Sequence, residues 1–131
     1  MATVSISADL GSVTVRSAGH PPPILAGQGA LTDLNGRAPL GVAFGRRRLA
    51  GTTYHLHGPW SLVAYTDGLF EVRTQAGDIL SVDEVPAIVH EARSATGQVE
   101  PDALIAAFAK RGDHVWRDDV AVITVDGTGP S

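Results

Sequence analysis

The chain has 131 residues, of which 44% are hydrophobic and 18% charged, and it contains no cysteine. These values are typical of one globular domain with a substantial core, and they exclude a disulfide scaffold and a thiolate metal site. A net charge of −4 argues against a surface that binds nucleic acid or an anionic membrane. No apolar run approaches the ~20 residues of a membrane span, and the N-terminus lacks the pattern of a signal peptide. We therefore expect a soluble, cytoplasmic protein.

The first half of the sequence has the period of β-structure. Residues 2–8 and 12–18 alternate between apolar and polar side chains, and the turn sequence Asp9-Leu10-Gly11 separates them. This pattern predicts a hairpin with one covered face. The three prolines after His20 cannot donate backbone hydrogen bonds, so the chain leaves the ladder there. Further short strands are predicted at residues 24–26, 30–34 and 52–57.

Residues 60–66 give the strongest strand signal, because the run at 62–66 is apolar, β-branched and aromatic. Such a run is typical of a strand buried on both faces. The run ends in Asp67-Gly68, where an acidic residue disfavoured in strands meets a residue with unusual backbone freedom. A carboxylate at the rim of a rigid sheet can bind a metal ion, and the same pair can also form an ordinary turn.

The second half adds helices and a further strand. Ser81 and Glu84 are spaced as a capping box, and Pro86 favours a regular helix that begins near Val85. Residues 101–110 predict a second helix with proline at its start. Residues 120–125 are apolar on both faces and predict another central strand of a sheet.

The spacing of two aspartates relative to these strands is informative. Asp67 follows one predicted central strand, and Asp118 precedes the other. If the two strands are antiparallel neighbours, both carboxylates lie at one rim of the sheet. Like charges held close together raise each other's pKa unless a cation lies between them, and hard oxygen ligands favour Mg²⁺ or Mn²⁺. Capping or turn formation by the two aspartates is the alternative.

Other candidate residues have simpler explanations. His55 and His57 share one face of a strand and could chelate a metal, as in a cupin-like barrel, but no Glu follows at short range. A polar outer face explains the pair better. His20 could act as a general acid, although an ordering role in the turn is favoured. The arginines at 46–48 could bind phosphate, but a solvated loop is the better explanation in an acidic chain.

Motifs along the chain occur in an order that resembles a known family. They are AGHPPP at residues 18–23, PLGV at 39–42, YTDGLFE at 65–71 and RDDVAV at 117–122. Together they resemble the C-terminal half of the bacterial metal-dependent protein serine/threonine phosphatases (the phosphatase 2C superfamily), in the branch of the SpoIIE and RsbU regulators. The resemblance extends from about residue 2 to residue 125.

The resemblance implies an α+β fold in which two antiparallel sheets form a β-sandwich flanked by helices. It also implies two Mn²⁺ or Mg²⁺ ions that activate a water to attack phosphoserine or phosphothreonine. Asp67 and Asp118 would be metal ligands, Asp119 an auxiliary carboxylate, and Gly68 would keep the backbone close to the site. The implied substrate is a phosphorylated regulatory protein, of the anti-sigma-factor antagonist type, in sigma-factor or stress-response control.

One departure from the family pattern shapes the expectation for this chain. The family domain begins with another metal-binding Asp in a Gly-Gly-Asp context and with an Asp-Gly pair, and neither is present; Asp9 lies in a hairpin turn. We therefore expect residues 1–126 to be a partial phosphatase domain without its N-terminal strands and helices, followed by a tail at 127–131. At most one weak metal site is expected. Uncovered apolar sheet surface predicts a homodimer or a partner that supplies the missing half. The alternative function is a catalytically inactive module that binds a regulatory partner.

Overall fold

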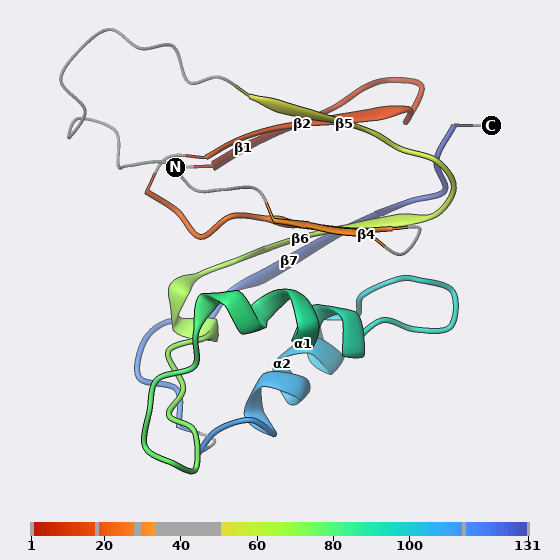
Figure 1. Ribbon diagram of the computed structural model, residues 1–131. Coiled ribbons are helices and arrows are strands. Elements are labelled where there is room, and N and C mark those ends of the chain that lie inside the picture. Colours follow the sequence, from red (N-terminus) through yellow and green to blue (C-terminus); the bar gives the residue numbers. More distant parts are fainter. Residues whose placement is uncertain (1, 18, 28–29, 34–50, 114, 131) are drawn as a thin grey trace, which may run out of the picture.

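The computed structural model describes residues 2–17, 19–27, 30–33, 51–113 and 115–130, with the backbone alone for 30–33. Figure 1 shows two stacked β-sheets and a layer of helices on the far side of one of them. The three-stranded sheet has the order β1-β2-β5, and the four-stranded sheet has the order β4-β3-β6-β7. All neighbouring strands are antiparallel. The strands are β1 (Ala2–Ile6), β2 (Ser12–Ser17), β3 (Ile24–Gly27), β4 (Ala30–Asp33), β5 (Thr52–His55), β6 (Trp60–Tyr65) and β7 (Val122–Gly127).

This architecture confirms the predicted α+β sandwich, and the alternating pattern of the N-terminal hairpin explains its inner core. In β2, Val13 and Val15 face the other sheet, where they meet Leu25 of β3 and Leu62 of β6. The cluster between the sheets comprises Val13, Val15, Leu25, Leu56, Trp60 and Leu62.

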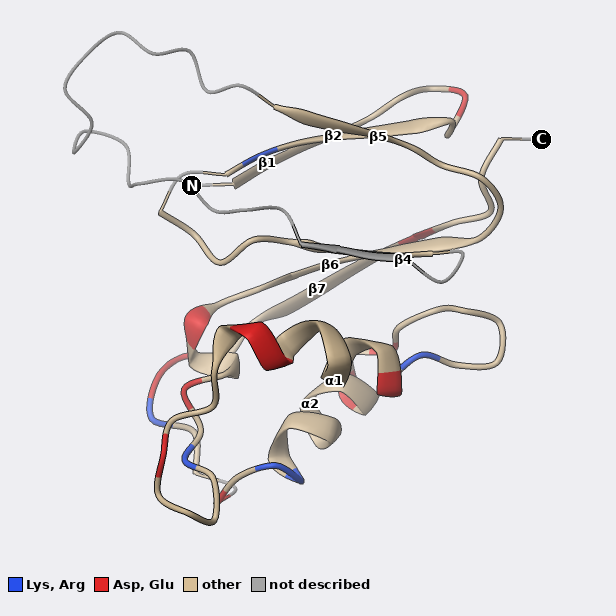
Figure 2. Ribbon diagram, viewed as in Figure 1, with Lys and Arg blue, Asp and Glu red and all other residues tan. Residues whose placement is uncertain are grey.

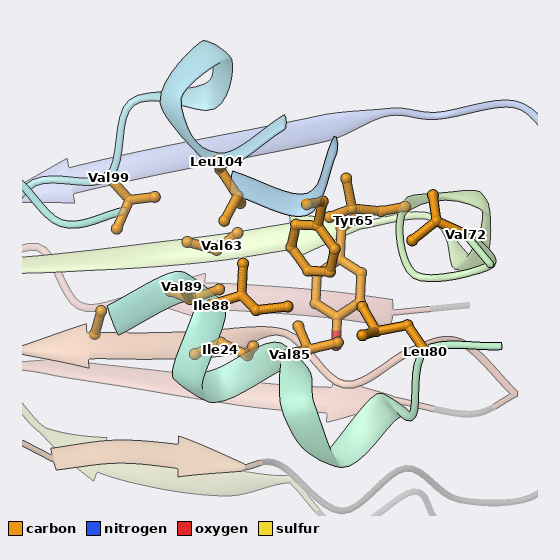
Figure 3. Close-up of a cluster of buried hydrophobic side chains, with 13 residues drawn as sticks. Ile24, Val63, Tyr65, Val72, Leu80, Val85, Ile88, Val89, Val99 and Leu104 are labelled. Atoms are coloured by element: carbon orange, nitrogen blue, oxygen red, sulfur yellow. The ribbon is translucent and has the colours of Figure 1, made fainter. Parts of the chain in front are cut away.

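A second and larger core lies between the four-stranded sheet and the helices (Figure 3). Because side chains alternate along a strand, Leu62 of β6 faces the sandwich interior while Val63 faces the helices. Every residue of β6 except Ala64 is buried, which confirms the predicted strand with two covered faces. The cluster comprises Ile24, Ala26, Val63, Tyr65, Leu69, Val72, Leu80, Val85, Ile88, Val89, Val99, Leu104 and Phe108.

The helices begin where the sequence predicts. Ser81 and Glu84 form the capping box around the short 3₁₀ helix η2 (Val82–Glu84), which leads into α1 (Val85–Glu91). The helix α2 (Pro101–Ala109) has its proline in the first turn, where the missing N–H is not needed. Among the described residues, no helix is long and apolar enough to cross a membrane.

The predicted second central strand is an edge strand instead. β7 pairs with β6 on one side, and within the described part of the chain no strand pairs with its other side. Ile123 and Val125 are 64% and 38% exposed. The apolar residues on both faces of this strand therefore did not mean that the strand is central. The pattern does not show how many neighbouring strands it pairs with.

The surface of the three-stranded sheet also differs from expectation. Its outer face, which no described helix covers, carries polar side chains such as Thr14 and Thr53, whose hydroxyls lie 2.8 Å apart. Among the strands, exposed large apolar residues lie on the edge strands β1 and β7, at Val4, Ile6, Ile123 and Val125. The motif at 39–42 and the arginines at 46–48 fall outside the described residues.

Candidate metal site at the rim of the sheet

Asp67 lies two residues beyond the end of β6, where the chain turns through the short 3₁₀ helix η1 (Asp67–Leu69). The Asp67 carbonyl accepts hydrogen bonds from the N–H groups of Phe70 and Glu71, at 3.1 and 3.2 Å. Gly68 and Leu69 are buried beneath the turn, whereas Asp67 is exposed. The turn is thus anchored by its backbone and by Leu69, and the Asp67 carboxylate stays at the surface.

The segment that carries Asp118 and Asp119 is hydrogen-bonded to the same turn. The Thr66 hydroxyl donates to the Asp119 carbonyl at 2.8 Å and accepts from the Ala121 N–H at 2.9 Å. The Thr66 N–H donates to the Ala121 carbonyl at 3.0 Å, which extends the β6–β7 ladder beyond its last strand pair. The predicted arrangement of antiparallel neighbours is confirmed, so both acidic segments lie at one end of the sheet.

Gly68 allows the two segments to approach closely. A Cβ atom added to Gly68 would lie 2.5 Å from the Asp119 carbonyl oxygen and 3.1 Å from the Asp118 carbonyl oxygen. Since the shorter contact involves backbone, a side chain could not be accommodated there by a rotamer change. The close approach expected of Gly68 is therefore to the chain segment at Asp118 and Asp119.

Sequence reasoning did not identify Thr66 as a residue of the site. It treated Thr66 only as the last residue of a β-branched strand, yet the hydroxyl bridges the two segments. The available signal was a hydroxyl residue directly before Asp-Gly, since Ser and Thr often bond nearby backbone groups where regular structure ends.

The acidic groups of this rim are not neutralised by the neighbouring arginine. Arg117 is paired with Asp113, with Nη2 2.5 Å from Oδ2. Its hydrogen bond lowers the pKa of the Asp113 carboxyl from 3.8 to about 2. Asp118 Oδ1 accepts the Asp119 N–H at 2.7 Å, and both residues are exposed. Figure 2 shows the acidic turn after β6 at the end of the sheet.

The donor set fits a hard divalent cation in kind but not in number. Carboxylate oxygens are the ligands that Mg²⁺ and Mn²⁺ favour. In the part of the chain that the structure describes, however, no group of three or more His, Cys, Asp or Glu side chains is arranged to hold an ion. The rim presents Asp67, Asp118 and Asp119, and a closed site needs donors from elsewhere.

The remaining candidates lie in other surroundings. His20 Nδ1 is 2.8 Å from the Pro21 carbonyl oxygen, and the Ser17 hydroxyl donates to the His20 carbonyl. The pairing of Ile24 with Val63 brings the segment that precedes β3 to the end of the sheet where β6 ends. His20 itself lies four residues before Ile24, and its ring is engaged in the turn. Asp9 lies in the turn between β1 and β2, in the other sheet, and its carboxylate accepts a hydrogen bond from the Gly11 N–H.

The paired histidines do not form a metal site. His55 is the last residue of β5 and pairs with Ser12, and both His55 and His57 are exposed. Neither belongs to a group of metal-ligating side chains within the described ranges. The structure therefore supports the polar-face explanation over the cupin-like one.

Comparison with known proteins gives a family match. The model of the family described as Stage II sporulation protein E (SpoIIE) matches residues 1–127. No individually curated protein sequence matches the chain.

Solved structures show the same fold at low sequence identity. The phosphatase domain with a regulatory fragment of SpoIIE from Bacillus subtilis is 16% identical, with a TM-score of 0.67 over 92% of this chain and 35% of that one. The manganese-presoaked SpoIIE phosphatase domain is 14% identical, with a TM-score of 0.69 over 95% and 55% of the two chains. The RsbU and RsbW domains of a Mycobacterium tuberculosis protein are 24% identical, with a TM-score of 0.67 over 99% and 36%. The chain thus spans about a third to a half of these structures.

Proposed function

This chain belongs to the SpoIIE family, and on that premise we propose that it is the C-terminal portion of a metal-dependent protein serine/threonine phosphatase domain. The observation that carries the proposal is that the turn at Asp67–Leu69 and the segment at Asp118 and Asp119 lie against each other at one end of the sheet. Thr66 and Gly68 hold the two segments together there.

Each residue of the rim has a proposed task. Asp67 and Asp118 hold a divalent cation through their carboxylate oxygens, and Asp119 is an auxiliary carboxylate beside them. Gly68 keeps the backbone of the two segments in contact, and Thr66 fixes their spacing. A bound Mn²⁺ or Mg²⁺ would supply charge neutralisation at a phosphoryl group and a lowered pKa of bound water.

The full two-ion site is proposed to require residues outside this chain. The family resemblance implies further metal-binding aspartates, in a Gly-Gly-Asp context and an Asp-Gly pair, that the given sequence does not contain. A second polypeptide segment that supplies further acidic ligands would complete the site. The substrate proposed from the family resemblance is a cytoplasmic regulatory protein that carries phosphoserine or phosphothreonine, in sigma-factor or stress-response control.

A binding module without turnover is the second candidate. It is favoured by the same shortage of metal ligands, because a fold that keeps its sandwich and rim can still recognise a regulatory partner. The two candidates differ in one measurable property, which is Mn²⁺-dependent hydrolysis when the missing ligands are supplied.

The test uses p-nitrophenyl phosphate and a phosphoserine peptide at millimolar Mn²⁺. The chain is assayed alone and mixed with the part of the Mycobacterium tuberculosis RsbU domain that it does not cover. Turnover in the mixture that Asp67→Asn and Asp118→Asn abolish, and that Asp9→Asn leaves unchanged, supports the enzyme. A stable complex without turnover favours the binding module. Absence of turnover in the mixture contradicts the enzyme candidate.

A further inference from the structure

The segment that leads from α2 to the acidic rim runs beside the chain that follows η1 (Figure 1). Gly112 forms an isolated antiparallel bridge with Thr74, and the Asp113 N–H donates to the Arg73 carbonyl at 2.9 Å. A Cβ atom added to Gly112 would lie 2.8 Å from the Arg73 carbonyl oxygen, so the two backbones are in close contact. With the hydrogen bonds of Thr66 at the rim, the two segments are thus tied together at both ends.

Between these two ties, the Asp113 carboxylate closes a turn that ends directly before Asp118. Its Oδ1 accepts the Val115 N–H at 3.2 Å. Arg117 donates to both carboxylate oxygens, from Nη1 at 3.3 Å and from Nη2 at 2.5 Å. Arg117 Nη1 also donates to the Val115 carbonyl at 3.3 Å. One side chain therefore holds two later positions of the segment, while its own backbone N–H holds the chain that follows η1.

The ion pair contributes little to the stability of the fold as a whole. The side chains of Arg117 and Asp113 are 39% and 34% exposed, and pairs with this exposure are only weakly stabilising. Trp116 packs against the larger core and anchors the segment without the pair. What the pair adds is a defined conformation, because the planar guanidinium fork fixes geometry in a way that a point charge does not.

We propose that Asp113 and Arg117 are positioning residues for the metal site. By closing the turn before Asp118, they hold the Asp118 carboxylate where it can bind a divalent cation together with Asp67. This role rests on the proposed function, in which Asp67 and Asp118 are the ligands. Arg117 is itself a cation, and the Asp113 oxygens are occupied by Arg117, so both residues act through the backbone of Asp118 and not as ligands.

The charge of Arg117 separates this role from a purely electrostatic one. A positive charge one residue from Asp118 disfavours a bound cation, so loss of the charge alone should tighten Mn²⁺ binding. Loss of the fixed turn should weaken binding instead, because the apparent affinity falls with the fraction of time that the carboxylate spends in its binding position. Removal of Arg117 therefore has opposite effects under the two explanations.

The test is a Mn²⁺ titration of the full chain, read from the paramagnetic broadening of the Asp118 amide signal. Arg117→Gln should weaken binding by roughly tenfold, the lower end of the loss caused by removing support from a metal ligand. Arg117→Lys, which keeps the charge without the fork, and Asp113→Asn should weaken it as well. Arg111→Gln is the matched control, because it breaks the similarly exposed pair with Glu91 on α1, and it should not weaken binding.

A measurement without metal separates position from stability. Backbone NMR relaxation should show increased motion at Asp118 in Arg117→Gln, whereas urea unfolding should change little. Equal or tighter Mn²⁺ binding in Arg117→Gln, or equal weakening in Arg111→Gln, overturns the positioning role and leaves the proposed metal site standing. If the unchanged chain shows no selective broadening at Asp118, the metal site itself is contradicted, and the positioning role with it.

Discussion

The hydroxyl of Thr66 donates to the carbonyl of Asp119 at 2.8 Å, although 53 positions separate the two residues in the sequence. The same hydroxyl accepts the N–H of Ala121, so a single side chain ties the end of β6 to the approach of β7. This contact holds the segment that carries Asp119 against the end of β6.

Thr66→Val should weaken the rim without disturbing the strand. Valine keeps the β-branched shape but removes the hydroxyl, which leaves the Asp119 carbonyl and the Ala121 N–H without their partner. The expected loss of unfolding free energy is about 1 kcal/mol, measured by urea denaturation. Thr66→Ser retains the hydroxyl and is the control. Equal stability of Thr66→Val and the unchanged chain would show that the contact contributes nothing.

Gly68→Ala should separate the two acidic segments. The added methyl group would lie 2.5 Å from the Asp119 carbonyl oxygen, so either segment must move. We expect a loss of about 1 to 3 kcal/mol of stability and altered amide NMR shifts at Asp118 and Asp119. Gly11→Ala is the control, because its nearest neighbours are the Asp9 carboxylate atoms at 3.3 Å or more. Shift changes confined to Gly68 itself would contradict the close approach.

Ser61→Ala should destabilise the packing of the loop that precedes α2. The buried Ser61 hydroxyl accepts the Val99 N–H at 3.1 Å and donates to the Asp126 carboxylate. Alanine leaves the buried Val99 N–H without a partner, at an expected cost of about 1 to 3 kcal/mol in thermal or urea unfolding. Ser5→Ala, on the exposed face of β1, should change stability little. Identical effects of the two substitutions would refute the bridging role.

The Asp113 carboxyl should titrate near 2 rather than at its ordinary 3.8, because Arg117 donates to it. A lowered pKa in the folded state means that the ion pair stabilises the fold above about pH 4, and that this contribution is lost as the pH falls toward 2. Carboxyl NMR titration measures the value directly. In Arg117→Gln the pKa should return toward 3.8. An unchanged pKa in that variant would assign the shift to another cause.

The sequence was sufficient to predict the helix starts, the buried strand β6 and the approach of the two acidic segments, for identifiable physical reasons. The side chains of Ser81 and Glu84 hydrogen-bond to backbone N–H groups within the same turn. A stretch of four residues is therefore enough to predict where the helix begins. The apolar run of β6 required cover on both faces, and the alternation of β2 required cover on one. The approach of the segment at Asp118 and Asp119 to the turn that begins at Asp67 followed from antiparallel pairing.

The position of β7 at an edge could not be read in the same way. Ile123 and Val125 look like core residues in the sequence, because composition records what a strand would bury but not whether a neighbour is present. The role of Thr66 was equally hidden. The sequence does not distinguish a threonine that only favours a strand from one whose hydroxyl joins two distant segments. Both features depend on contacts between distant segments, and local pattern does not encode them.

The most direct test of the central claim is a Mn²⁺ titration of the isolated chain, followed by paramagnetic broadening of amide NMR signals. We expect selective broadening at Gly68, Asp118 and Asp119, saturating weakly in the millimolar range at no more than one ion per chain. Asp67→Asn and Asp118→Asn should each abolish it, and Asp9→Asn should not. Broadening that is uniform over the acidic surface, or that survives in both variants, would contradict a metal site at this rim.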